Sequence, residues 1–451
     1  QRERFADYLP SIRSAMVEKI TRSALSMRDL NMLAQISREF RPDLARMCDS
    51  IAYAIEPTSD TPPPPEHLRA ASLGAGVGVV FPLLAEFQDR YGFSDRGLGM
   101  LSAAAFVAAL VSGLFLAGLA DRGHARLLMV GGIALSAVGL LWFATATELW
   151  QFTSARLLEG LGYGVFLPAA RKVVTIGDPA RAGQRLGRLT SAELAGFLAG
   201  PVIGSLLSEV VGLWAPLALI GAVQVAMAAW LLSIRIPTLV GSARPGGGLG
   251  AALAPFRMMR RGAVTGAALL SLTIFLPVGV YDALWSRYLT DQGASTLFIG
   301  IGLSLYSLPI VLLAPTGGRV ADRIGPVRAT ALAICLIIPL TVTYGLLAAP
   351  VAITAMGLLE SFPQSLATPS VQTAMLRACR PDEVAAGQGL AHAVNQIGAG
   401  AAALLGPILY GAAGATVLFA SLGAVMAVLF VIGLTLNRRG GGEAIAVLDG
   451  G

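Results

Sequence analysis

The sequence predicts an all-α membrane protein of twelve transmembrane helices in two six-helix bundles, preceded by a short helical extension. First, 55% of the 451 residues are hydrophobic and 13% are charged, which is too apolar for a soluble chain of this length. Second, the segment GLADRGHAR at 118–126 returns as GRVADRIGPVR at 318–328, each time between two long apolar runs. Third, other residues recur at the same separation of 201, among them Glu159 with Glu360 and Pro168 with Pro369. These repeats predict an internal duplication with about six hydrophobic segments per half.

Twelve hydrophobic segments follow one another from residue 68 onward. Each is long enough for the roughly 20 apolar residues that cross a bilayer as a helix. Their glycines and prolines are tolerated in membrane helices when neighbouring helices cover the loosened backbone. The segments are 68–88, 97–120, 126–147, 150–174, 186–209, 213–235, 263–289, 296–318, 328–348, 351–376, 383–410 and 415–436. They predict a first bundle at 67–236, a cytoplasmic linker at 237–262, a second bundle at 263–438 and a tail at 439–451.

The first 66 residues differ from the rest because they hold no run that could span a bilayer. Apolar residues at helical spacing, such as Phe5, Leu9 and Ile12, predict short amphipathic helices, and TSDTPPPP at 58–65 predicts a stiff spacer. The sequence shows no signal peptide and no initiator Met, so we expect a longer parent chain or processing. This extension is either a packing appendage or a regulatory module that binds an upstream domain or a protein partner.

The distribution of basic residues predicts the orientation. Turns on one side of the predicted bundle carry only Arg90, Arg96 and Arg287, whereas the opposite turns carry many basic residues, such as Arg122 and Arg323. Since Lys and Arg accumulate in cytoplasmic loops, both termini are predicted to be cytoplasmic, in a multi-pass protein of the cell (inner or plasma) membrane. The spread of these charges over loops also explains the basic composition without nucleic-acid binding.

The repeated turn resembles the signature of the major facilitator superfamily, G-x-L-A-D-R-x-G-R, and the likeness extends over about 68–438. The second copy fits closely through Gly318, Asp322 and Arg323, whereas the first copy has Ala117 at the leading glycine. The resemblance implies the superfamily's fold and a conformational latch on the cytoplasmic side. The latch residues would be Asp121, Arg122, Gly318, Asp322 and Arg323. Alternatively, these charges only determine topology.

The fourth predicted span contains RLLEGLGYG, which resembles the family's R-x-x-Q-G-x-G motif with Glu159 at the Gln position. Arg156, Glu159 and Tyr163 are three and four residues apart, so they share one face of a helix. Charged groups inside a bilayer cost a few kcal/mol or more, so this Arg and Glu require each other, water or a ligand. Either Glu159 binds a proton or a cationic substrate while Arg156 adjusts its protonation, or the two form a structural ion pair.

The fifth predicted span resembles the family's antiporter motif, G-x8-G-x3-G-P-x2-G-G. The matching residues are Gly187, Gly196, Gly200, Pro201 and Gly204, with a serine in place of the last glycine. Glycines four residues apart form a smooth face that another helix can approach closely. In the family this pattern is associated with exporters that exchange substrate for protons. A seam that serves packing alone would look similar.

Further polar residues lie in other predicted spans, where they are functional candidates because lipid disfavours them. Asp282 could instead pair with Arg287, and His392 could be an ordinary hydrogen-bonded interior residue. With Arg156, Glu159 and Tyr163, the predicted proton-coupling and substrate cavity comprises Glu193, Asp282, Glu360, Gln364, His392 and Asn395.

The sequence contains no phosphate-binding loop of the G-x4-G-K-[ST] kind and no metal or nucleophile set, so neither an enzyme nor a cofactor is predicted. The predicted function is proton-coupled export of small amphipathic or lipophilic compounds by alternating access, in which protonation of Glu159 or Glu360 changes the favoured state. Small-molecule substrate, protons and the lipid bilayer are the predicted partners. Two alternatives are an uptake symporter for a small solute and a transporter-like sensor that signals through the extension.

Overall fold

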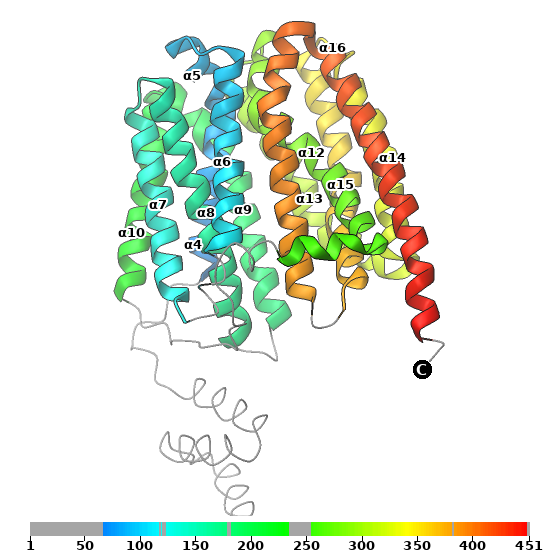
Figure 1. Cartoon of the computed structure of the whole chain (residues 1–451). Helices are drawn as coiled ribbons and strands as arrows, with labels where there is room; N and C mark the ends of the chain where they lie inside the picture. The colour runs from blue at the N-terminus through cyan, green and yellow to red at the C-terminus, as the bar shows by residue number, and fades with distance from the viewer. Residues whose placement is uncertain are drawn as a thin grey trace, which may run out of the picture.

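The computed structural model describes residues 66–116, 119, 123–177, 182–233, 254–380 and 383–448. The predicted extension and spacer up to residue 65, the turn residues Asp121 and Arg122, and most of the predicted linker lie outside these ranges. Within them every regular element is a helix, so the predicted all-α fold class is confirmed. Figure 1 shows long helices running side by side between two ends of the molecule. The end at the top, with the α5 turn, is called the α5 end, and the end at the bottom, with the C-terminus, is called the C-terminal end.

The first half is built from helices that cross the molecule in alternating directions. The first crossing is a helix with a short 3-10 segment inside it. The elements are α4 (Glu66–Val80), η1 (Phe81–Leu83), α5 (Leu84–Tyr91), α6 (Asp95–Phe115), α7 (Ala125–Thr145), α8 (Leu149–Gly177), α9 (Ala182–Val210) and α10 (Trp214–Ser233).

The second half begins with a short 3-10 helix and continues in the same way. Its last helix contains the final two predicted segments, joined by a kink at Gly414, where φ is 79°. The elements are η4 (Ala254–Arg260), α12 (Gly262–Asp291), α13 (Thr296–Ile324), α14 (Pro326–Tyr344), α15 (Pro350–Ala378) and α16 (Val384–Leu448).

Nine helical stretches in the described part are long and apolar enough to cross a membrane. One of them, Ala386–Arg439, includes both arms of the kinked α16. The helices α8 and α15 are not among the nine, although each has 29 residues. They bear buried polar side chains, including Arg156, Glu159 and Glu360. The two crossings that are less continuously apolar than these nine therefore occupy equivalent places in the two halves.

The internal duplication is visible in matching local structure. Ser94 caps α6 by accepting a hydrogen bond from Gly97 N at 3.2 Å, and Ser295 caps α13 by accepting one from Phe298 N at 3.3 Å. Each cap leaves one fewer unsatisfied N–H group at its helix start. Because these two serines are 201 residues apart, the separation found in the sequence also relates equivalent helix starts.

The two halves meet along α6 with α16 and along α9 with α13. Gly99 of α6 and Gly300 of α13, again 201 residues apart, lie at these two contacts. A Cβ atom on Gly99 would be 2.6 Å from Leu404 O, and one on Gly300 would be 2.6 Å from Pro201 O, so both helices approach more closely than a side chain allows.

Ala85 and Ser286 are also 201 residues apart, and they contact each other directly. The Ala85 N–H donates to Ser286 Oγ at 3.2 Å, and this hydroxyl donates to Pro82 O at 2.8 Å. Equivalent positions of two halves can touch only near the axis that relates them. This contact therefore places the pseudo-two-fold axis between α5 and α12.

Candidate functional site

A buried ion-pair triad joins the two halves near the middle of the bundle. Arg156 of α8 donates to Glu159 Oε2 at 2.7 Å and to Asp282 of α12 at 3.2 and 3.4 Å. The three residues are 1%, 2% and 4% exposed. Arg156 lies seven residues from the start of α8, or about 10 Å along the helix axis from the α5 end. Helical spacing puts Arg156 and Glu159 on one face of α8, and Asp282 from the other half completes the triad.

The charges of this triad do not balance. One guanidinium faces two carboxylates, which leaves one negative charge uncompensated if both carboxyl groups are ionised. Glu159 Oε1 is buried and accepts no hydrogen bond in the described part. An uncompensated buried charge is costly, and it is relieved by a proton or by a bound cation. The free oxygen of Glu159 is a place where either could bind.

The second buried acid, Glu360 of α15, has a different environment. Its carboxylate accepts hydrogen bonds from Tyr344 Oη at 2.5 Å, from Tyr281 Oη at 3.0 Å and from Thr341 Oγ1 at 3.4 Å. None of these donors is charged, and within the described ranges Glu360 forms no ion pair with a basic side chain. At ten residues from the start of α15 it is about 15 Å from that end, roughly half of a 30 Å hydrocarbon core.

Aromatic rings surround Glu360. The ring centroids of Trp285 are 5.1 Å from Tyr281 and 5.0 Å from Tyr344, and those of Tyr281 and Tyr306 are 6.3 Å apart, all edge to face. Tyr281 and Tyr306 are only partly buried, so one side of the group is accessible. These four rings with Glu360 are called the aromatic box below.

Other predicted cavity residues lie apart from the triad. Tyr163 donates to the Glu193 carboxylate of α9, so these two form a pair of their own. Asn395 of α16 is 7% exposed, and its Oδ1 accepts no hydrogen bond in the described part. His392 lies in exposed surface of α16, facing Gly113 of α6.

Gln364 follows the box residue Glu360 by one helical turn and is 8% exposed. It therefore belongs to the same face of α15 as the box. The predicted cavity set thus falls into the triad, the box with Gln364, the pair of Tyr163 with Glu193, and the α16 residues His392 and Asn395.

The second copy of the predicted latch lies at the C-terminal end of α13. Asp322 is exposed, and its ion pair with Arg377 of α15 is loose at 4.0 Å. Arg323 is also exposed, and a Cβ atom on Gly318 would meet nothing within 4 Å. The charged residues of this second copy are therefore exposed, and the ion pair of Asp322 is long.

The predicted glycine motif of α9 faces α4. A Cβ atom on Gly200 would be 2.8 Å from Ala75 O, and one on Gly204 would be 2.7 Å from Val79 O. Gly196 meets Ala71 even more closely. Gly187 lies in the first turns of α9, and Pro201 lies within the helix.

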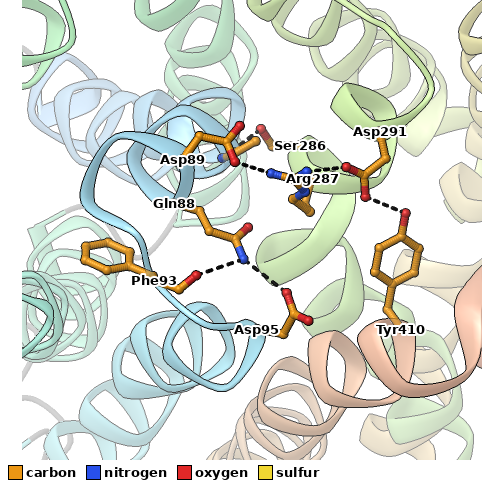
Figure 2. A network of polar contacts seen from close by, with 9 residues as sticks. Gln88, Asp89, Phe93, Asp95, Ser286, Arg287, Asp291 and Tyr410 are labelled. Carbon is orange, nitrogen blue, oxygen red and sulfur yellow. Dashed lines mark hydrogen bonds and ion pairs between the residues drawn. The ribbon is translucent and has the colours of Figure 1, made fainter.

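The α5 end is closed by a polar network between the halves (Figure 2). Arg287 of α12 donates to Asp89 of α5 and to Asp291, which also accepts from Tyr410 Oη at 2.7 Å. Arg287 therefore does not pair with Asp282, contrary to the alternative considered from the sequence. The network borders a cavity of about 720 Å³ whose lining includes Gln88, Asp95 and Gln292.

Sequence reasoning missed the hydroxyl donors Thr341 and Tyr344, the ring of Tyr306 and the glycine at 357. Thr and Tyr in an apolar span give no periodic signal, and their convergence on Glu360 depends on helix rotation. One signal was present: position 357 is the equivalent of Arg156 in the repeat, and it holds glycine.

Comparisons with known proteins agree with this geometry. The family described as Major Facilitator Superfamily matches residues 70–290 and 267–445. Multidrug resistance protein MdtG of Salmonella paratyphi A is 26% identical over 316 residues, which are 67% of this chain and 77% of that protein. The crystal structure of a bacterial homolog of the human lysosomal transporter Spinster, inward-facing and unoccupied, superposes with a TM-score of 0.69 at 15% identity over 83% of this chain and 95% of that one. The crystal structure of the nucleoside transporter NupG gives a TM-score of 0.65 at 15% identity over 82% of this chain and 98% of that one.

Proposed function

Since the chain belongs to the major facilitator superfamily, it is a multi-pass membrane transporter of small molecules and not an enzyme, and we propose that it exports small amphipathic or lipophilic compounds in exchange for protons. The observation that carries the proposal is the triad, in which two buried carboxylates share one guanidinium. One proton or one positive charge restores neutrality there. If substrate binding and protonation of the triad disfavour each other, substrate and proton can be exchanged across a membrane.

The triad is suited to coupling because it bridges the halves. Arg156 and Glu159 belong to α8 of the first half, and Asp282 belongs to α12 of the second. Alternating access requires the halves to rock against each other around a site near the midplane. Any change of charge at Glu159 or Asp282 then changes the attraction between the halves, and with it the preferred state.

The direction of transport is proposed from two features. The α9 glycine motif resembles one associated with substrate–proton exchange, and similar proteins are multidrug resistance proteins.

We place the chain in the cell (inner or plasma) membrane with both termini in the cytoplasm, because the basic turns lie at the C-terminal end.

In this orientation the structure is closed toward the outside. Polar contacts that join the halves lie between the triad and the α5 end, among them Arg287 with Asp89 and Thr296 with Glu86. At the cytoplasmic end, the ion pair of Asp322 with Arg377 is long at 4.0 Å and lies within the second half, so it does not join the halves. This state would load substrate from the cytoplasm.

The proposal is tested with purified protein in liposomes under an imposed pH gradient, using a panel of cationic, neutral and anionic amphipathic compounds. A transported compound should drive proton movement in the opposite direction, and Glu159→Gln should reduce this movement to that of empty liposomes. Glu148→Gln removes an exposed carboxylate just before the start of the same helix and serves as the control. Full proton movement in Glu159→Gln would overturn the role of the triad, and substrate movement with the protons would indicate symport.

A further inference from the structure

The two halves carry buried acids at equivalent positions, but the surroundings of these two acids differ. Glu159 and Glu360 are 201 residues apart on α8 and α15, and both are at most 2% exposed. Three residues before Glu159 stands Arg156, whose guanidinium binds it at 2.7 Å. Three residues before Glu360 stands Gly357, which has no side chain. At this position the second half therefore lacks the cation that Arg156 supplies in the first.

The space at Gly357 leads into the aromatic box. A Cβ atom on Gly357 would be 3.5 Å from Tyr344 Oη, 3.7 Å from Tyr306 Cδ2 and 3.8 Å from Trp285 Cζ2, which are ordinary contact distances. An arginine there would point toward the rings and toward Glu360, one turn away. The rings thus surround the region that the equivalent guanidinium would occupy.

We propose that the aromatic box binds the ammonium or guanidinium group of a cationic substrate, which takes beside Glu360 the place that Arg156 takes beside Glu159. This deepens the proposed export function and rests on it, since it names organic cations as a substrate class. The box supplies both forces that a cation needs in an apolar site. The carboxylate supplies the opposite charge, and the ring faces attract cations within about 6 Å of their centroids.

The hydrogen bonds of Glu360 fit this role. Three hydroxyl groups donate to its two oxygens, an arrangement that suits a carboxylate because an ionised acid only accepts. They hold the carboxylate in place without neutralising it. A substrate cation would remove the remaining cost of the buried charge, whereas a neutral compound of similar shape would not.

Equilibrium binding of radiolabelled phenyltrimethylammonium to purified full-length protein, without any pH gradient, tests the proposal. We expect saturable binding to the wild type. Glu360→Gln keeps the shape of the side chain and its ability to accept hydrogen bonds, and it should weaken binding by about tenfold or more. Gly357→Arg should weaken it as strongly because it supplies the missing cation from within the chain.

Gly389→Arg is the matched control, since it introduces the same side chain on α16, where a Cβ atom would meet nothing within 4 Å. It should bind the probe as the wild type does. If Gly357→Arg does not remain monodisperse, Trp285→Leu replaces it and should weaken binding by removing one ring. Wild-type affinity in Glu360→Gln, or in a monodisperse Gly357→Arg, would overturn the proposal.

Failure of the aromatic box and failure of the proposed function give different results. Binding without a gradient does not depend on proton coupling, so intact binding with no coupled flux would refute only the exchange mechanism. Conversely, a Gly357→Arg protein that still exports neutral compounds against protons and has unchanged affinity for the cation would refute only the aromatic box as a cation site.

Discussion

Arg156 is the residue on which the electrostatics of the molecule's centre depend. It is almost fully buried and is, within the described ranges, the one cation that forms ion pairs with Glu159 and Asp282. A buried ion pair adds little stability compared with an apolar replacement, but removal of one partner leaves an isolated charge. The intact triad therefore adds little net stability, whereas loss of any one partner is costly.

Arg156→Gln should lower the free energy of unfolding by about 3–5 kcal/mol, because it leaves two buried carboxylates without a cation. The loss should shrink as the pH falls, since protonation neutralises the carboxyl groups. Thermal unfolding in detergent at several pH values measures both effects. Arg156→Gln combined with Asp282→Asn should recover part of the loss, and no recovery would contradict the coupling of these two residues.

The sequence predicts the pair of Arg156 with Glu159 on α8, but it does not predict their partner Asp282. Arg156 and Glu159 are three residues apart on one helix, so their proximity follows from helical geometry alone. Asp282 lies 126 residues away from Arg156, and its approach depends on how α12 is rotated and tilted. The same reason hides Thr341 and Tyr344, which reach Glu360 from α14.

Among the elements, the contact of α4 with α9 depends most on small residues. Glycines on both helices let the backbones approach to distances that a side chain would prevent. Gly74 and Gly78 of α4 face α9, while Gly196, Gly200 and Gly204 face α4. The predicted glycine spacing therefore has a packing consequence, and its part in proton exchange remains a proposal.

Gly200→Ala should destabilise the protein by about 1–3 kcal/mol, the usual cost of overpacking. Its Cβ atom would lie 2.8 Å from Ala75 O, a backbone atom that cannot move alone. Gly389→Ala, where a Cβ atom meets nothing within 4 Å, should leave the melting temperature unchanged or slightly higher. Equal melting temperatures for the two variants would show that the approach of α4 and α9 is looser than described.

The element boundaries were predicted unevenly. Apolar length and polar turns locate most ends of the crossings to within about five residues, because a bilayer demands about 20 apolar residues. The exceptions are α13, which ends six residues after the predicted segment, and α16, which ends twelve residues after it. The last two segments are continuous in the structure, where a sharp bend at Gly414 replaces the expected break. A positive φ at one glycine reverses the chain without any polar turn, and hydropathy alone does not report it.

At the level of the whole molecule, polar contacts join the two halves at the α5 end. Arg287 with Asp89 joins the halves directly, and the Ser286 hydroxyl joins them near the pseudo-two-fold axis. Since Arg287 and Asp89 are partly exposed, their pair adjusts the balance between states rather than fixing it.

Asp89→Asn should favour opening of the α5 end. An exposed ion pair contributes up to about 1 kcal/mol, so the population ratio of open to closed molecules should rise by as much as about fivefold. Distances between spin labels placed on exposed positions of α6 and α13 near this end report the ratio. An unchanged distance distribution would mean that the pair does not hold the halves together.

The arrangement of the halves was foreseeable in outline only. Repeats at a separation of 201 predict two equivalent bundles, and the matching caps at Ser94 and Ser295 follow from them. The repeats do not specify which helices meet across the interface, because that depends on small residues such as Gly99 and Gly300 and on the conformational state.

The most direct test of the central claim is the number of protons released when a cationic substrate binds to purified protein in weakly buffered solution, read with a pH indicator. The account predicts release from the wild type and from Glu148→Gln, and none from Glu159→Gln, because substrate binding favours the state in which the triad gives up its proton. Equal release from wild type and Glu159→Gln, or no release from a wild type that binds the substrate, would contradict it.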